Sequence, residues 1–284
     1  MIFLPNVLLE MISGYSDENK LIHLLEKNLE KIDWRELSEN PAAIHLLEKN
    51  PDKINWVWLS RNPAAIHLLE YEITNAEREN RPEKICWWRL SDNPAAIHLL
   101  EKNPDKTHWY WLSKNQAAIH LLEKNPDKII WVILSSNPAA IHLLEKNPKK
   151  IDWMFLSRNP AAIHLLEKNL EKIDWRELSG NPAAINLLES EAHRAQREKY
   201  PEKIDWRLLS RNPAAINLLE KNPDKIYWRL LSRNTAAINL LEKNPDKIYW
   251  DELSNNQAIF KSSKNEIYNS LYKIQNWIYK LDLL

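Results

Sequence analysis

The chain of 284 residues carries 39 basic and 39 acidic residues, so its formal net charge at pH 7 is zero, and it has one cysteine, Cys86. Charges of both signs alternate along the sequence, which excludes the long-range positive field that attracts proteins to nucleic acids or anionic membranes. A single cysteine excludes an intramolecular disulfide framework, and two glycines in the whole chain leave few of the tight turns that β-hairpins and phosphate loops need.

Residues 1–28 are predicted to form an N-terminal cap and a partial repeat. The apolar start MIFLPNVLLEMI has no Lys or Arg before Lys20, so it lacks the basic flank of a secretion signal, and it is too short to span a bilayer. We therefore expect an intracellular, non-secreted protein. The stretch LPNVLLEMI resembles the opening of an F-box, which would imply an adaptor to a ubiquitin ligase. The alternative is a hydrophobic cap, because the partial repeat ENKLIHLLEKN follows directly.

Ten copies of one unit occupy residues 29–257. Successive copies of the pattern Trp-x-x-Leu-Ser-x-Asn are 22 residues apart, except at two steps of 31 residues. The repeated tryptophans are Trp34, Trp56, Trp87, Trp109, Trp131, Trp153, Trp175, Trp206, Trp228 and Trp250. The longer steps each contain nine extra polar residues, near 70–81 and 190–200, which predict longer second helices that project from the array. Such a period is typical of stacked repeats that share a core.

Asparagines at Asn-Pro steps, such as Asn40-Pro41 and Asn50-Pro51, divide each unit into two segments. Proline disfavours helical geometry at the residue before it and suits the first position of a helix, and asparagine can cap the exposed amides. Where the proline is absent, as at Asn115-Gln116, the asparagine remains, which favours a capping role. Each of these steps is therefore predicted to begin a short helix.

Helical wheels place the apolar residues of each segment. In the second helix, Ala43 and Leu47 share one face, and in the first helix Trp34 and Leu37 share a face opposite Ile32. Helices of about nine residues are marginal alone and need neighbouring units to pack against. The sequence thus predicts an all-α fold, an α-solenoid of ten 22-residue two-helix repeats with hydrophobic N- and C-terminal caps.

A leucine-rich repeat is the competing fold, because its period and its leucine pattern are similar. That fold needs an inward apolar residue two places before the leucine of the Leu-Ser pair. Half of the units carry a charged residue there, for example Arg35 and Asp251. The charges favour the α-solenoid.

Histidine recurs at one position of the second helix and is replaced by asparagine in later units. The residues are His23, His45, His67, His98, His120, His142 and His164, followed by Asn186, Asn217 and Asn239. Successive copies should lie about 9 Å apart, too far for shared metal coordination at about 2.1 Å per bond. We expect a surface or inter-repeat hydrogen-bonding role. We expect no metal, no cofactor and no catalysis, because no catalytic constellation or phosphate loop stands out.

The two residues after the repeated tryptophan vary most, and they lie on the helix face opposite the tryptophan and the leucine. The outer units carry charges there, and the middle five carry a set of apolar residues. The apolar set is Val57, Trp58, Trp88, Tyr110, Trp111, Val132, Ile133, Met154 and Phe155. Such a stripe predicts a contact with a protein partner or with a second copy of the chain. The alternative is that the stripe is buried within the array. Stacking of bases is disfavoured because no basic residues accompany the aromatics.

Residues 258–284 carry apolar side chains at alternating spacings of four and three residues. They are Ile267, Leu271, Ile274, Ile278 and Leu281. The spacing predicts a C-terminal capping helix. A dimerising coiled coil is the alternative, although two heptads are few for one.

The unit KIDWxxLSxNPAAIHLLEKNP, over about residues 17–257, resembles the Trp- and Asn-Pro-containing helical repeats of proteins from giant nucleocytoplasmic DNA viruses. The resemblance implies a viral, non-enzymatic interaction scaffold in the cytoplasm of an infected host or in the virion. Its partner would be a host or viral protein. A structural role in the virion, as a minor capsid or other component, is an alternative that the resemblance also implies, and the F-box-like stretch implies a third, an adaptor to a host ubiquitin ligase.

Overall fold

The computed structural model describes residues 26–199, 201–256 and 258. Over this part of the chain every regular element is helical, and nineteen α-helices, α3 to α21, follow one another. The chain divides between Ile130 and Trp131 into two compact units, called unit 1 and unit 2. The F-box-like stretch and nearly all of the two predicted caps, at 1–28 and 258–284, lie outside the described residues.

Each repeat contains a first helix that begins at the repeated tryptophan and, up to the last repeat, a second helix that begins at an isoleucine. The first helices are α3 (Trp34–Glu39), α5 (Trp56–Leu59), α7 (Trp87–Ser91), α9 (Trp109–Lys114), α11 (Trp131–Leu134), α13 (Trp153–Ser157), α15 (Trp175–Ser179), α17 (Trp206–Arg211), α19 (Trp228–Leu231) and α21 (Trp250–Leu253). The second helices are α4 (Ile44–Lys49), α6 (Ile66–Arg78), α8 (Ile97–Lys102), α10 (Ile119–Lys124), α12 (Ile141–Lys146), α14 (Ile163–Glu167), α16 (Ile185–Glu198), α18 (Ile216–Glu220) and α20 (Ile238–Glu242).

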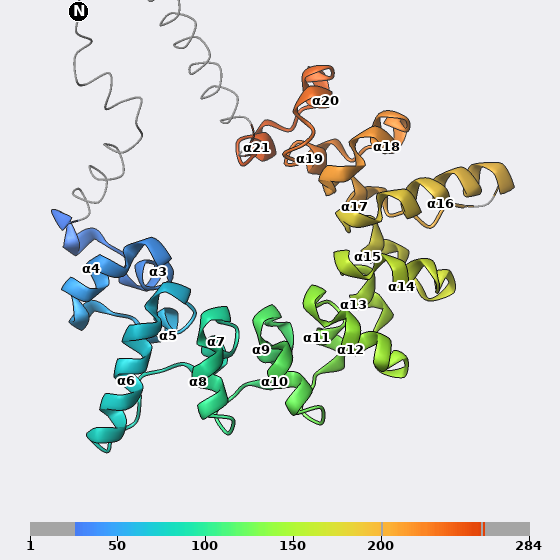
Figure 1. The fold of residues 1–284 in the computed structure, drawn as a ribbon. Coiled ribbons are helices and arrows are strands. Elements are labelled where there is room, and N and C mark those ends of the chain that lie inside the picture. Colours follow the sequence, from blue (N-terminus) through green and yellow to red (C-terminus); the bar gives the residue numbers. More distant parts are fainter. Residues whose placement is uncertain (1–25, 200, 257, 259–284) are drawn as a thin grey trace, which may run out of the picture. The chain divides into compact units, whose positions relative to one another are not determined.

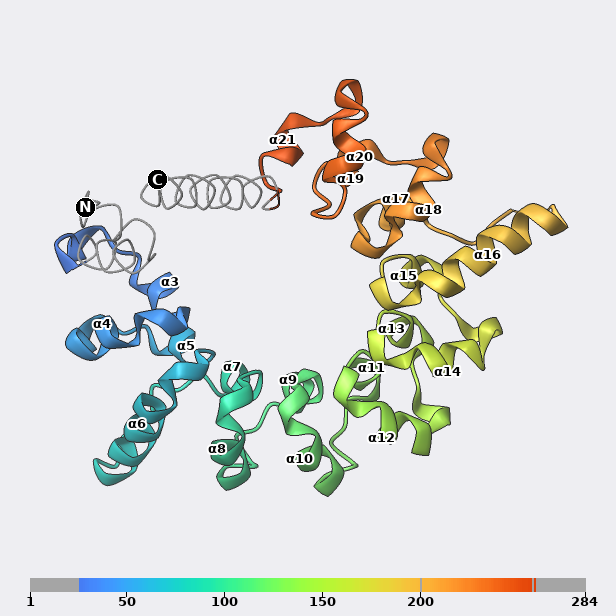
Figure 2. The same ribbon diagram turned by 45° about the horizontal axis from the view of Figure 1, so that its top comes forward.

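Within each unit, first helices follow one another along one side and second helices along the other (Figure 1). Figure 2 shows the same order from a second direction. First helices of successive repeats contact each other, as α7 and α9 do in unit 1 and α15 and α17 do in unit 2. The predicted all-α repeat solenoid is confirmed.

The first helix is shorter than predicted, because it begins at the tryptophan and not at the Asn-Pro step. In the repeat of α5, Pro51–Lys53 forms a single 3₁₀ turn, and Ile54 and Asn55 are then extended, with ψ of 123° and 96°. The wheel that placed Ile32 opposite Trp34 was therefore wrong, since the isoleucine is not part of the helix. The side chain of Asn55 caps the new start by accepting from the Trp58 amide at 3.4 Å.

The two asparagines of a repeat have different roles. Asn62, in the Ser-x-Asn-Pro step, accepts the Ala64 amide at 3.0 Å and caps the 3₁₀ turn Pro63–Ala65, as predicted. Asn50, in the Lys-Asn-Pro step, makes no such cap. Its side-chain amide donates to the Leu46 carbonyl at 2.9 Å, which satisfies a carbonyl at the end of α4.

Leucine and alanine form the core of each repeat. In the repeat of α13 and α14, Leu156, Ala162 and Leu166 have no exposed surface, and the equivalent residues are buried in the neighbouring repeats. Within each unit, successive 3₁₀ turns of this kind contact each other, as Pro160–Ala162 contacts Pro182–Ala184. Alanine is small enough for these turns to pack closely.

Buried asparagines link each repeat to the preceding one. The amide of Asn159 donates to the carbonyls of Ser135 at 3.0 Å and Asn137 at 3.1 Å, one repeat earlier. Equivalent bonds to the preceding serine carbonyl, at 3.0 to 3.1 Å, come from Asn62, Asn93, Asn115, Asn181, Asn212, Asn234 and Asn256. This asparagine ladder supplies these buried serine carbonyls with a donor from the next repeat.

The serine of the Leu-Ser-x-Asn pattern makes a second link, to the repeat that follows it. The Ser135 hydroxyl donates to the Trp131 carbonyl at 2.8 Å and accepts the Asp152 amide of the next repeat at 3.0 Å. Ser38, Ser60, Ser91, Ser113, Ser157, Ser179, Ser210 and Ser232 accept the equivalent amide. The Leu-Ser-x-Asn pattern is thus the element that joins the repeats.

The two insertions lengthen the second helix, as predicted. Helices α6 and α16 have 13 and 14 residues, whereas the other second helices have five or six. Both extend beyond their neighbours within their own unit (Figure 1). The two long helices are followed by left-handed residues, Asn80 with φ of 50° after α6 and Lys199 with φ of 56° after α16.

Candidate interaction surface

The predicted stripe consists of two columns that differ in exposure. The outer column contains the first residue after the repeated tryptophan and is exposed by 41 to 44%. Its members in the predicted stripe are Val57, Trp88 and Tyr110 in unit 1 and Val132 and Met154 in unit 2. The inner column contains the second residue after the tryptophan. Its members in the predicted stripe are Trp58 and Trp111 in unit 1 and Ile133 and Phe155 in unit 2.

Packing between repeats accounts for the inner column. Ile133 is buried, with 8% of its surface exposed, and Trp58, Trp111 and Phe155 are partly buried. The alternative prediction, that the stripe is buried within the array, is therefore correct for Ile133 and partly correct for the other three residues. Successive helical residues point about 100° apart, so the first residue after the tryptophan faces solvent while the second faces the neighbouring repeat.

In unit 1 the two columns form an aromatic platform, defined here as Trp88, Tyr110 and Trp111. The ring centroids of Trp88 and Trp111, from successive repeats, are 5.6 Å apart, and those of Tyr110 and Trp111 are 5.3 Å apart at an angle of 77°. These are favourable spacings for aromatic pairs. The partly buried Trp111 therefore supports two exposed rings in fixed positions.

Arg89 extends this platform towards the preceding repeat, and no sequence pattern predicts this contact. Its guanidinium carbon lies 4.0 Å from the ring centroid of Trp58 and 4.6 Å from that of Trp88. Within the described residues, its Nε is buried and has no hydrogen-bond partner. Both aromatic faces stabilise the cation, so Arg89 holds the two rings together.

In unit 2 the outer column changes character along the chain. Val132 and Met154 are exposed, and the next equivalent residues are Arg176, Arg207 and Arg229. Phe155, in the inner column, has the guanidinium carbon of Arg158 at 5.3 Å from its ring centroid. Arg158 also pairs with Glu177, and this hydrogen bond lowers the pKa of the Glu177 carboxyl.

Eight of the ten repeated tryptophans are partly buried, Trp206 is buried with 9% of its surface exposed, and Trp250 is 67% exposed. Trp153 is only partly buried, and the Lys172 amine of the next repeat lies 4.7 Å from its ring centroid. The same contact recurs in Trp56 with Lys84, Trp87 with Lys106, Trp131 with Lys150, Trp175 with Lys203, Trp206 with Lys225 and Trp228 with Lys247. Each of these seven tryptophans is thus a seat for a lysine of the next repeat.

Four of the recurring histidines form hydrogen bonds between repeats, as predicted. The Nε2 atom of His67 lies 2.8 Å from the Glu48 carboxylate of the preceding repeat. Equivalent pairs are His98 with Glu70, His120 with Glu101 and His164 with Glu145. The pairs lie on the outer surface of the second helices, where they reinforce the buried ladders.

A buried carboxylate marks the first insertion. Glu72, on α6, is 3% exposed and accepts two hydrogen bonds from the Arg81 guanidinium, at 2.7 and 3.0 Å, and one from the Lys84 amide at 3.0 Å. The Arg81 hydrogen bonds are the main cause that lowers the pKa of Glu72. These hydrogen bonds hold the segment after α6, which leads to the next repeat, against the helix.

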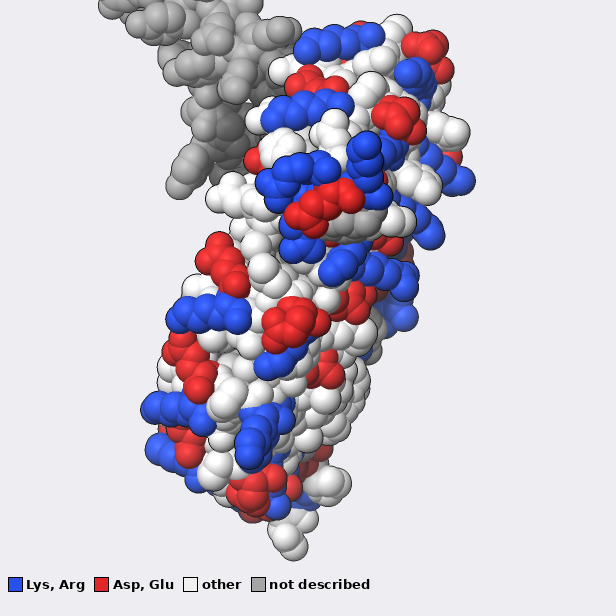
Figure 3. All heavy atoms as spheres, turned by 90° about the vertical axis from the view of Figure 1, so that its right-hand side faces the viewer, with Lys and Arg blue, Asp and Glu red and all other residues white. Residues whose placement is uncertain are grey.

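Charge is distributed evenly on the face that Figure 3 shows, where Lys and Arg side chains alternate with Asp and Glu. Within residues 26–199, 201–256 and 258, no three His, Cys, Asp or Glu side chains come together in a group that could hold a metal ion. No helix in the same part of the chain combines the length and apolarity needed to cross a bilayer. No family model, curated protein or solved structure matches the chain.

Proposed function

We propose that the chain is a non-catalytic scaffold that binds a protein partner through the outer column, with the aromatic platform of unit 1 as the main contact. The single observation that carries the proposal is the exposure of Trp88 and Tyr110, at 41% and 44%, on a rigid support. Trp, Tyr and Arg are the residues that contribute most to binding at protein interfaces. The platform combines all three through Arg89.

The geometry favours a partner over a purely internal role. A side chain that serves only the array is covered by the array, as Ile133 is. Trp88 and Tyr110 both pack against Trp111, yet 41% and 44% of their surfaces remain exposed. Because these rings are already fixed, a partner would lose little side-chain entropy on binding them.

The balance of charges favours a protein over a nucleic acid as this partner. Nucleic-acid binding draws most of its affinity from many phosphate contacts with Lys and Arg. The chain has equal numbers of acidic and basic residues. In unit 1 the outer column is apolar from Val57 to Tyr110, with Arg89 packed between rings in the inner column.

The test compares the wild-type chain with a Trp88→Ser/Tyr110→Ser double variant in affinity pull-downs from the cells in which the chain is naturally made. Both side chains are more than two-fifths exposed, so we expect the variant to keep its helical circular-dichroism spectrum. Tyr71→Ser, on α6, is the matched control, since Tyr71 is 64% exposed and lies outside the platform. Proteins captured by the wild type and the control should be lost with the double variant.

The proposal is wrong if the folded double variant captures the same proteins as the wild type, or if the wild type captures nothing above a tag-only control. Light scattering of the purified chain at several concentrations identifies the case in which the partner is a second copy. A dimer that Trp88→Ser/Tyr110→Ser converts to a monomer would assign the platform to self-association.

A further inference from the structure

The outer-column arginines of unit 2 face the residue that precedes the tryptophan of the next repeat. For Arg176 this residue is Asp205, and the Arg176 Nε lies 3.8 Å from the Asp205 carboxylate. For Arg207 the residue at this position of the next repeat is Tyr227, and for Arg229 it is Tyr249. The carboxylate that neutralises the first arginine is therefore replaced by a phenol at the next two positions.

The replacement leaves Arg207 without a charged partner. Arg229 is neutralised by α21, because its Nε lies 3.0 Å from the Glu252 carboxylate and its terminal nitrogen 3.6 Å from Asp251. Arg207 is exposed and forms no ion pair with any other described residue. A guanidinium ready to bind an anion thus remains at this step of the array.

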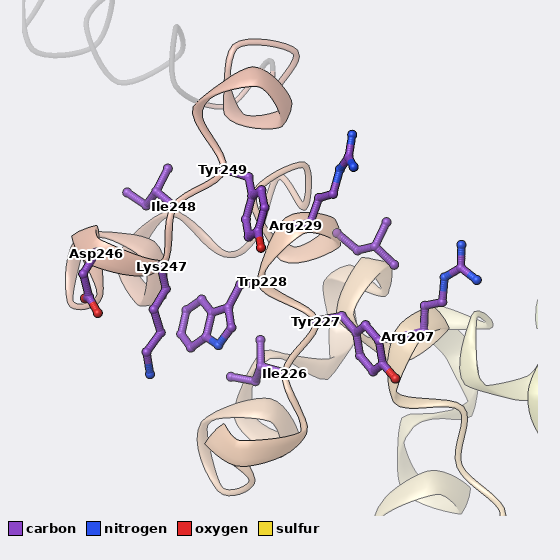
Figure 4. A pocket seen from close by; sticks show the side chains of 10 residues that line it. Arg207, Ile226, Tyr227, Trp228, Arg229, Asp246, Lys247, Ile248 and Tyr249 are labelled. Carbon is purple, nitrogen blue, oxygen red and sulfur yellow. The ribbon is translucent and has the colours of Figure 1, made fainter.

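Arg207 lines an open pocket of about 720 Å³ between the repeats of α19 and α21. Figure 4 shows Arg207 beside the ring of Tyr227, and Tyr249 on the next repeat. Ile226 and Ile248 supply apolar surface, and Lys247 supplies a further cation, 4.8 Å from the Trp228 ring centroid. Among the residues that line the pocket, Asp246 is the one acid against three cations.

We propose that this pocket binds a peptide segment in which an acidic group stands next to an apolar side chain. The acidic group, a carboxylate or a phosphate, pairs with Arg207, and the apolar side chain packs on the ring of Tyr227 or Tyr249. A peptide fits better than a small molecule, because both tyrosines are half exposed, at 53% and 48%, whereas small-molecule sites bury most of their ligand. The pocket is in unit 2, so the proposal does not rest on the aromatic platform of unit 1.

The first test selects binders for the full-length chain from a random dodecapeptide display library. Enriched peptides should carry Asp or Glu next to an aliphatic or aromatic residue. A synthetic peptide of the enriched sequence should bind Arg207→Gln about tenfold or more weakly than wild type, as expected for the loss of a charged hydrogen bond. Arg211→Gln, an exposed arginine of α17 outside the pocket, is the control and should bind as wild type.

Further probes define the acidic group. Replacing the peptide's Glu by Gln should abolish binding. Comparing the affinities of the Glu peptide and a phosphoserine peptide shows whether the pocket prefers a carboxylate or a phosphate. A single-stranded oligothymidylate of similar charge should not compete with the peptide. Competition by the oligonucleotide, or selection of peptides without an acid, overturns the proposal.

Tyr227→Asp provides a second test that does not depend on removing the arginine. Asp205 occupies the equivalent position and caps α17 by accepting the Leu208 amide at 2.9 Å, so an aspartate at 227 suits the fold. It should neutralise Arg207 as Asp205 neutralises Arg176, and acidic peptides should lose about tenfold or more in affinity. Unchanged affinity in both Tyr227→Asp and Arg207→Gln would refute the site, whatever the outcome for Trp88 and Tyr110.

Discussion

The side-chain amide of Asn62 donates to the Ser38 carbonyl, 24 residues earlier, at 3.0 Å, while its oxygen accepts the Ala64 amide at 3.0 Å. One side chain thus starts its own second helix and fastens it to the preceding repeat. The bond to Ser38 is formed between residues with no exposed surface. Water cannot replace it, and for this reason the ladder contributes to stability and not only to geometry.

Removing a ladder asparagine should destabilise the array strongly. Asn159→Ala deletes two donated bonds and one accepted bond and leaves the buried Ser135 carbonyl without its donor, while the Asn137 carbonyl keeps the Ala140 amide. We expect a loss of about 3 kcal/mol in the free energy of unfolding, measured by urea denaturation. Asn147→Ala is the control, because Asn147 donates one partly buried bond to the Leu143 carbonyl and should cost about 1 kcal/mol. Equal losses in the two variants would contradict the role of the ladder.

The serine link should be sensitive to loss of a single oxygen. Ser157→Ala removes the acceptor of the Asp174 amide, 3.0 Å away, and creates a buried unpaired N–H. The expected loss is about 1 to 3 kcal/mol in the same denaturation assay. Ser136→Ala is the comparison, since its hydroxyl donates only within its own repeat, to the Ile133 carbonyl. If hydrogen exchange at Asp174 is as slow in Ser157→Ala as in wild type, the link does not protect that amide.

Much of this architecture follows from the sequence, and the omissions have physical causes. The leucine core, the caps of the Pro-Ala-Ala turns and the histidine contacts come from spacing and side-chain chemistry. The start of the first helix was missed because Ile54 is extended, and no local propensity signals that break between Pro51 and Trp56. The exposure of the remaining side chains depends on packing between neighbouring repeats, which a helical wheel does not describe.

The candidate surface illustrates this limit. A wheel placed Val132 and Ile133 on one face, yet Val132 is 43% exposed and Ile133 8%. The difference depends on how closely the adjacent repeat approaches. The position of Arg89 cannot be predicted in the same way, because an isolated charge between aromatic positions is typical of a surface residue. In the structure its guanidinium lies between two indole rings.

Acid should weaken unit 1 through Glu72. Its folded-state pKa lies below the ordinary value of 4.5 because Arg81 hydrogen-bonds the carboxylate, so the stabilisation is present above about pH 4.5 and is lost as pH falls through the folded-state pKa. Glu72→Gln should therefore be less stable than wild type at pH 7, and the difference should shrink towards pH 3. Melting temperatures from pH 7 to pH 3 measure it, with Glu77→Gln on the same helix as the control. Parallel pH profiles for wild type and Glu72→Gln would contradict the assignment.

Variants at a tryptophan seat should separate the contributions of packing and of charge to the free energy of unfolding. Lys172→Met keeps the apolar stem of Lys172 over Trp153 but removes the cation, and should cost about 0.5 to 1 kcal/mol. Trp153→Ala removes the seat itself and should cost about 3 kcal/mol, the low end of the range for buried tryptophans, because Trp153 is only partly buried. Urea denaturation of both variants tests this order. A Lys172→Met variant as unstable as Trp153→Ala would show that the charge dominates.

The insertions leave the ladder unchanged. Asn93 and Asn212, which follow the long helices α6 and α16, reach the preceding serine carbonyl at 3.1 Å, as close as Asn115 does after the short helix α8. The end of the second helix is therefore a point at which the chain tolerates additional sequence without loss of register between repeats. We expect a foreign segment, such as a reporter peptide or an epitope, to be accepted at this point while the frame of the array stays constant.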